Sequence, residues 1–186
     1  MNRIYVVIFF IIILIPVVSW GWKVFNYVDA ERKTAEYETL ADQNNEVVDA
    51  INDVISSANA RSDLIRQAIN PANEFRNGAV ELLKMTTDDL AERVEAVRPT
   101  VEAAVLADND AANAFRAEGL RLLQVYEQSV PVFAEITAIV TNSDLSDDER
   151  QQRVESKLGP LEQGLGDAVT RLEDARMAYV DASRPN

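Results

Sequence analysis

Residues 44–65 read NNEVVDAINDVISSANARSDLI, and the apolar pattern of this stretch decides the fold. Alternating steps of four and three residues through it and its flanks trace one continuous seam. The seam positions are Tyr37, Leu40, Asn44, Val47, Ile51, Val54, Ala58, Arg61, Ile65 and Ala68. Such a heptad repeat predicts a helix that packs against other helices, as in a coiled coil.

Two positions of this seam, Asn44 and Arg61, are polar. A polar residue in a seam commonly fixes the register and order of the helices at some cost in stability. A buried Arg61 needs a carboxylate, and Glu173, Asp174 and the nearby Asp63 are candidates. We therefore interpret Asn44, Arg61 and Asp63 as a structural polar seam. The alternative is a groove around Arg61 that binds a ligand or a partner.

The composition excludes most kinds of catalytic site. The chain has 186 residues with no cysteine and no histidine, so it has no thiolate or imidazole metal site and no histidine-based triad. Its 31 acidic and 18 basic residues give a net charge of −13, which argues against nucleic-acid binding. We predict that the protein is not an enzyme and uses no cofactor or metal, and that charged partners are basic.

The remainder of the chain predicts an all-α fold. Glycine and proline are scarce, and residues that favour helices are abundant. Four amphipathic segments joined by short turns predict an antiparallel four-helix bundle of long helices. The first helix is expected to end or kink at Asn70-Pro71, where Asn70 can cap a new helix, and the later turns lie at residues 106–113 and 141–150. Gly159-Pro160, Gly164 and Gly166 are expected to loosen the first turns of the fourth helix.

The apolar spacing also predicts which side chains face the core. Those of the second helix are Phe75, Ala79, Leu82, Leu83, Leu90, Val94, Val97, Val101 and Val105, with a re-capping point at residues 86–89. Those of the third helix are Phe115, Leu122, Leu123, Tyr126, Val130, Phe133, Ile136 and Val140. Those of the fourth are Leu161, Leu165, Ala168, Leu172, Ala175, Tyr179 and Ala182.

Residues 4–22, IYVVIFFIIILIPVVSWGW, form an uncharged apolar run. A length of about twenty residues matches a helix that spans the hydrocarbon core of a membrane. Arg3 precedes the run and acidic residues dominate after it, which favours an extracytoplasmic body. The alternative is a secretory signal cleaved near Ser19, which also places the body outside the cytoplasm.

These observations predict three regions. Residues 1–22 are a transmembrane signal-anchor, residues 23–36 are a juxtamembrane helix, and residues 37–186 are a helical bundle domain. The predicted location is the inner or cytoplasmic membrane, which the chain crosses once.

Two acidic turns could offer oxygen ligands to calcium, residues 108–110 and 144–149. Neither has the glycine and the terminal glutamate at the spacing of a calcium loop. Asp108 or Asn109 is well placed as a helix cap, and Ser146 with Glu149 three residues later has the pattern of a capping box. We interpret both turns as caps.

Several motifs resemble the LemA family. Asn45 followed by Arg61, Asp63, Leu64 and Ile65 is similar to the first helix of that family, where an Asn-x-Val stretch leads to Arg-x-Asp-Leu-Ile. RLEDARMAYVDASRPN, residues 171–186, resembles its terminal helix, and NAFRAEGLRLLQVYEQSVP, residues 113–131, resembles the segment before its Tyr-Pro. The resemblance implies a membrane-anchored helical bundle with no established enzymatic activity.

Together these features predict a non-enzymatic, membrane-anchored interaction or scaffold module at the cell envelope. Its expected partners are the membrane and other envelope proteins or further copies of itself, and the sequence identifies no small-molecule substrate. The alternative is an extracytoplasmic sensory or ligand-binding bundle. An apolar stripe that stays exposed after the bundle closes would favour the interaction module.

Overall fold

The computed structural model describes residues 3–85, 89–104, 106 and 109–183. Within its helices, the side chains of residues 3–31, 33–34, 36–37 and 89 are not described. The chain divides into two compact units, of which the larger is Asp42–Ser183. The smaller unit comprises Met1–Ala41 with Arg184–Asn186. All regular secondary structure in the described ranges is helical, which confirms the all-α part of the predicted fold.

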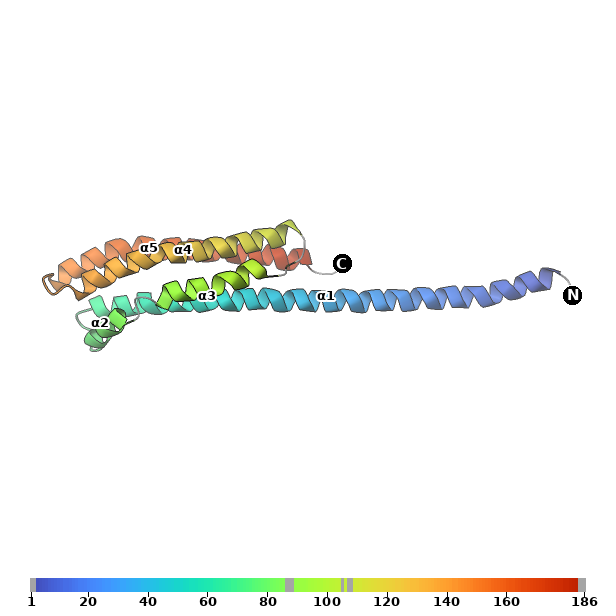
Figure 1. The fold of residues 1–186 in the computed structure, drawn as a ribbon, viewed down its shortest axis with the longest axis horizontal. Coiled ribbons are helices and arrows are strands. Elements are labelled where there is room, and N and C mark those ends of the chain that lie inside the picture. The colour runs from blue at the N-terminus through green and yellow to red at the C-terminus, as the bar shows by residue number, and fades with distance from the viewer. Residues whose placement is uncertain (1–2, 86–88, 105, 107–108, 184–186) are drawn as a thin grey trace. The chain divides into compact units, whose positions relative to one another are not determined.

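The elements are α1 (Arg3–Ile69), α2 (Arg76–Met85), α3 (Asp89–Ala103), α4 (Asp110–Thr141) and α5 (Asp147–Ser183). Within Asp42–Ser183 these helices form a bundle in which α4 packs against both α3 and α5 (Figure 1). Figure 1 shows that α3, α4 and α5 run in alternating directions. The segment predicted as the second helix forms two helices in the structure, α2 and α3.

The smaller unit contains the beginning of α1, which is helical from Arg3 onward. No helix in the described part of the chain is long and apolar enough to cross a membrane. The predicted membrane span, residues 4–22, lies in the part of α1 whose side chains are not described.

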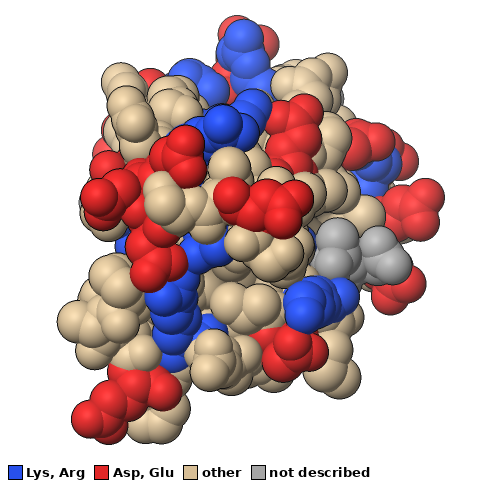
Figure 2. All heavy atoms as spheres, turned by 90° about the vertical axis from the view of Figure 1, so that its left-hand side faces the viewer, with Lys and Arg blue, Asp and Glu red and all other residues tan. Residues whose placement is uncertain are grey.

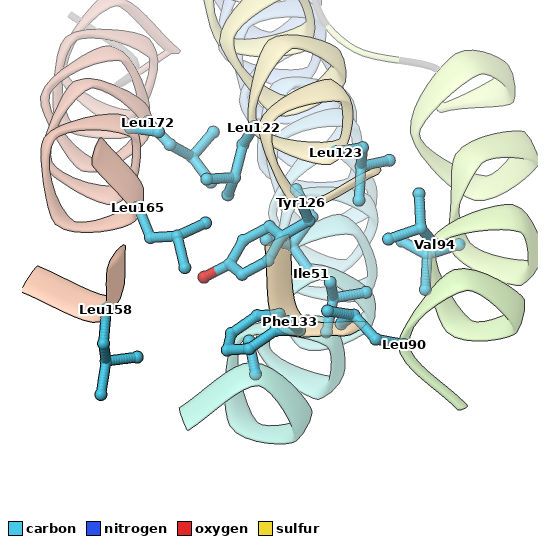
Figure 3. Packing of buried hydrophobic residues seen from close by; sticks show 14 of the residues in the cluster. Ile51, Leu90, Val94, Leu122, Leu123, Tyr126, Phe133, Leu158, Leu165 and Leu172 are labelled. Atoms are coloured by element: carbon cyan, nitrogen blue, oxygen red, sulfur yellow. The ribbon is translucent and has the colours of Figure 1, made fainter. Parts of the chain in front are cut away.

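The seam that begins in residues 44–65 is buried as predicted. Its buried members are Asn44, Val47, Ile51, Val54, Ala58, Arg61, Ile65 and Ala68. The other helices bring large side chains to the same core, as Figure 3 shows for Ile51, Leu90, Tyr126, Phe133 and Leu165. Steps of three and four residues place one side chain per turn on the inner face of each helix, so the bundle closes around one continuous core.

The connection from α1 to α2 differs from the prediction. Helix α1 ends at Ile69 as expected, but Asn70 does not begin a new helix. Its side chain accepts a hydrogen bond from the Ala72 amide at 3.0 Å and closes a turn of its own. Asn73 caps the next segment by accepting from the Phe75 amide at 2.9 Å, and α2 begins only at Arg76.

Two predicted core residues of this region are exposed, because α2 turns another side inward. Arg76, Ala79 and Leu83 lie on one face at helical spacing, and Ala79 and Leu83 are buried. Phe75 is 73% exposed and Leu82 is 48% exposed, so their predicted burial is wrong. The predicted re-capping residues 86–88 and Val105 lie outside the described residues.

Helix α5 continues from Asp147 to Ser183 without a break and includes Gly159-Pro160, Gly164 and Gly166. Pro160 lies on the exposed side of the helix, whereas Leu165, Ala168, Leu172 and Tyr179 are buried as predicted. Burial of this apolar face keeps the chain helical despite local sequence that disfavours helix.

Candidate functional site

Two grooves lie on either side of the C-terminal part of α1. The Arg61 groove, between α1 and α3, has a volume of about 310 Å³ and is lined by Asp53, Ser56, Ser57, Ala60, Arg61, Leu64, Leu90 and Arg93. The Asp63 groove, with a volume of about 540 Å³, lies between α1 and α5 over Tyr126 of α4. Residues 61 and 63 are about 200° apart around a helix of 3.6 residues per turn, so they face different grooves.

Arg61 crosses the bundle core and reaches α4. Its side chain is only 5% exposed, and its Nη2 donates a hydrogen bond to the Thr137 hydroxyl at 3.3 Å. Its guanidinium carbon lies 5.4 Å from the centroid of the Phe133 ring. A cation over an aromatic face is attracted to the electron-rich face of the ring, and more strongly where water is excluded. Arg61 therefore links α1 to α4 from inside the core.

The carboxylates predicted for Arg61 lie elsewhere. Glu173 is exposed and accepts from Arg176 at 2.9 Å. Arg171 lies 3.5 Å from Glu118, which places this end of α5 beside the beginning of α4. Thr137 lies about 28 Å farther along α4, at 1.5 Å of rise per residue. The predicted pairing of Arg61 with Glu173 or Asp174 is therefore wrong, because α5 runs antiparallel to α4.

The predicted polar seam is also narrower than expected. Asn44 is buried, but Asp63 is exposed and faces the Asp63 groove. The Asn44 side-chain oxygen accepts no hydrogen bond from the described residues. The structure thus buries Asn44 and Arg61 in the seam and leaves Asp63 outside it.

The Arg61 groove is bridged at its surface by an ion pair, in which Arg93 of α3 donates to Asp53 of α1 at 2.7 Å. The buried guanidinium group of Arg61, which lines this groove, already contacts Thr137 and Phe133 of α4. These contacts support the structural interpretation of Arg61 rather than the ligand groove considered from the sequence.

A polar network closes the end of the bundle at the α1–α2 and α4–α5 turns. Arg76 donates to the Ala68 carbonyl at 3.2 Å and to Asp147 at 3.1 Å. Arg150 donates to the same Asp147 at 2.6 Å and to the Asn142 carbonyl at 2.8 Å. The two arginines therefore satisfy carbonyl groups at the ends of α1 and α4, and Asp147 joins them.

This network makes the stability depend on the charge of Asp147. The hydrogen bond from Arg76 is the largest cause that lowers the pKa of Asp147 below its ordinary value of 3.8, and Arg150 lowers that pKa further. A carboxyl group whose pKa is lowered on folding stabilises the folded state above the unfolded pKa, and this contribution is lost as pH falls through the folded pKa.

We expect Asp147→Asn to lower the melting temperature of the full chain at pH 7, by an amount that shrinks as the pH falls below 3.8. Thermal unfolding followed by circular dichroism from pH 7 to pH 2 measures this difference. The exposed Asp144, in the same turn, provides the control Asp144→Asn. A loss that is equal at all pH values, or equally large for Asp144→Asn, would contradict the role of Asp147.

The acidic turns contain the caps that the sequence predicts. The Asn109 side chain accepts from the Ala112 amide at 2.8 Å. Ser146 and Glu149 form the reciprocal capping box, in which the Ser146 amide donates to Glu149 at 3.1 Å and the Glu149 amide donates to Ser146 at 3.3 Å. Asp108 lies outside the described residues. Within the described residues, no group of three or more acidic side chains is placed to hold a metal ion.

The structure exposes an apolar face at α2 whose residues Phe75 and Leu82 the sequence pattern places in the core. Phe75, Leu82 and Met85 are 73%, 48% and 80% exposed, and Gly78 between them has open space above it. We call these four residues the α2 stripe. Phe75 directly precedes α2 and its carbonyl accepts from the Ala79 amide at 3.0 Å, so the spacing of three, four and three residues places all four on one side. The sequence contains both apolar faces, this one and the face with Ala79 and Leu83. Their spacing alone does not indicate which face turns toward the core.

No protein-family model, no curated protein and no solved structure matches this chain. The resemblance to the LemA family therefore stays a prediction.

Proposed function

We propose that this protein is a non-enzymatic interaction module of the cell envelope, an antiparallel four-helix bundle anchored in the membrane by residues 4–22. The exposure of the α2 stripe carries the proposal. A large apolar side chain that is exposed alone is common, but several on one helix face mark a surface that contacts another molecule. The uncharged run at residues 4–22 supports the anchor, and the resemblance to the LemA family supports both parts.

The charge of the chain favours a basic partner over a second copy. Figure 2 views the end of the bundle that carries α2, where acidic and basic side chains are interspersed. Beside the α2 stripe Glu81 pairs with Lys84 at 2.7 Å, so the preference for a basic partner rests on the net charge of −13 that the whole chain carries. Two copies that meet at this end would place like charges together, whereas a basic segment would meet opposite charge. The proposed occupant is an amphipathic helix with large apolar residues and flanking Lys or Arg side chains.

Affinity capture from membranes after chemical crosslinking tests the proposal. The bait is the full chain, either unaltered or as the double variant Leu82→Ser with Met85→Ser. The matched control is Met177→Ser, because Met177 is a similarly exposed methionine on α5. We expect the unaltered chain and the control to capture the same protein, with crosslinks that map to a basic amphipathic segment of it.

The double variant should lose this protein at least tenfold while its melting temperature stays within a few degrees of the unaltered value. Equal capture by all three baits would contradict the proposal. Crosslinks that join two copies of α2 would also contradict it, because they would identify the partner as the chain itself.

A further inference from the structure

The Asp63 groove combines an apolar wall with several hydrogen-bond acceptors. Ile55 on α1 and Leu165 and Val169 on α5 supply the apolar surface. Helix α1 supplies acceptor oxygens from Asn59, Ser62 and Asp63. These residues share one side of the helix, because Asn59 precedes Ser62 by three positions and Asp63 by four. The groove can therefore contact an aliphatic chain and the polar group at its end.

Asp63 is the carboxylate in this groove that is not neutralised. The other acid, Glu162, accepts two hydrogen bonds from the Arg66 guanidinium, one from Nε at 3.3 Å and one from Nη2. Asp63 has no ion pair within the described residues, and its carboxylate gives the groove a negative charge. This charge disfavours an anion and favours a cation.

Tyr126 provides a polar group in the floor of the groove. The residue is 1% exposed and lines the groove. Figure 3 shows that the Tyr126 hydroxyl oxygen points toward Leu165 of α5, which lines the Asp63 groove. Burial raises the pKa of Tyr126 to about 12, so the hydroxyl is neutral at pH 7 and can accept or donate a hydrogen bond.

These acceptors fit a primary ammonium group better than a metal ion. An ammonium group has three N–H donors and carries one charge, which one carboxylate with neutral oxygens can satisfy. Calcium takes six to eight oxygen ligands, commonly from several carboxylates, and the described residues offer no such acidic group. The apolar wall of Ile55, Leu165 and Val169 suits the methylene chain that carries such an ammonium.

We propose that the Asp63 groove binds a primary alkylammonium group, with Asp63 and Tyr126 contacting the ammonium and Leu165 contacting its aliphatic chain. Two sources share this chemistry, a lysine side chain of another protein and a free polyamine. The site lies on α1 and α5, apart from the α2 stripe, so it does not depend on the proposed function above.

Gly166 offers a way to block the groove without disturbing the core. A Cβ added at Gly166 or at Gly164 would meet no atom within 4 Å, but only Gly166 lines the groove. Gly166→Leu should therefore fill the groove, and Gly164→Leu is its control on the same helix. Both variants should keep or raise the melting temperature, because leucine favours helix by up to about 1 kcal/mol over glycine.

The binding test is a titration of the isotope-labelled full chain, held in detergent, with n-butylammonium, followed through the NMR signals of Gly166 and the Tyr126 ring. We expect saturable shifts that Gly166→Leu abolishes and Gly164→Leu keeps. Asp63→Asn should weaken binding about tenfold, which corresponds to about 1.4 kcal/mol. Asp49→Asn, an exposed acid two heptads earlier on α1, should not. Tyr126→Phe should weaken binding several-fold without loss of the fold.

Two further titrations distinguish the sources of the ammonium. Tighter binding of spermidine than of a lysine-containing peptide identifies a polyamine site, and the reverse order identifies a docking site for a partner's lysine. Either order supports an ammonium site. The proposal is overturned if n-butylammonium gives no saturable shift, if tetramethylammonium binds equally well, or if Gly166→Leu leaves binding unchanged.

Discussion

Replacing Arg61 by alanine is expected to lower the free energy of unfolding by about 3 kcal/mol, because it removes several buried contacts together. A hydrogen bond from a charged donor contributes about 1.5–3 kcal/mol, and a desolvated cation–π contact contributes about 2 kcal/mol. Arg61 makes the first with Thr137 and the second with Phe133. Loss of its aliphatic stem adds a packing defect between α1 and α4.

Urea denaturation of the full chain in detergent measures this loss, and Arg66→Ala provides the control. Arg66 lies on the same helix, its side chain is 58% exposed, and its pair with Glu162 is at the surface. Surface pairs contribute at most about 1 kcal/mol, so the control should be mild. If Arg61→Ala is as mild as Arg66→Ala, Arg61 does not link α1 to α4 as the structure indicates.

A second large effect is expected at Gly119, which among the glycines with described surroundings has the closest neighbours from other helices. A Cβ added at Gly119 would lie 3.2 Å from Val101 Cγ1 on α3 and 3.4 Å from Ile51 Cδ1 on α1. A leucine there would force α4 away from both helices, and overpacking of a core costs about 1–3 kcal/mol and occasionally more. We expect Gly119→Leu to destabilise by about 3 kcal/mol.

The comparison with Gly164→Leu separates overpacking from a general effect of leucine at a helical glycine. Gly164 has open space above it, so its substitution should be neutral or stabilising. The double variant Gly119→Leu with Val101→Ala should recover part of the loss, because the nearest atom is removed. A Gly119→Leu variant as stable as Gly164→Leu would show that the helices are not packed as described.

The seam of α1 could be predicted from the sequence because heptad spacing is a local property of the chain. The eight seam residues from Asn44 to Ala68 are all buried, including the two polar ones. The partners of those polar residues could not be predicted in the same way. Which atoms meet Arg61 depends on the antiparallel order of the helices and on their relative heights, and periodicity within one helix carries neither.

The orientation of α2 shows the same limit. Its sequence offers two apolar faces, one with Ala79 and Leu83 and one with Phe75 and Leu82. Arg76 shares the first face, and its bonds to Ala68 and Asp147 turn that face toward the bundle. The orientation of α2 thus depends on contacts of Arg76 with the end of α1 and the beginning of α5. For this reason the α2 stripe, which supports the proposed function, required the structure.

The Asp63 groove also required the structure, although the sequence singled out Asp63. Its closeness to Arg61 in the sequence predicts a place in the seam, but the structure leaves it exposed. Two positions along a helix turn a side chain to nearly the opposite side, so the two charges serve different surfaces. The contribution of Tyr126 comes from α4, which no local pattern on α1 could indicate.

Photo-crosslinking in intact cells tests the central claim most directly, that the α2 stripe contacts a basic partner. A photo-reactive phenylalanine analogue at Phe75 is compared with the same analogue at Met177, which is exposed on α5. The account predicts a single protein crosslinked from position 75 and not from position 177, with the crosslink in a segment that combines Lys or Arg with large apolar residues. Equal products from both positions, or a product that is a dimer of this chain, would contradict it.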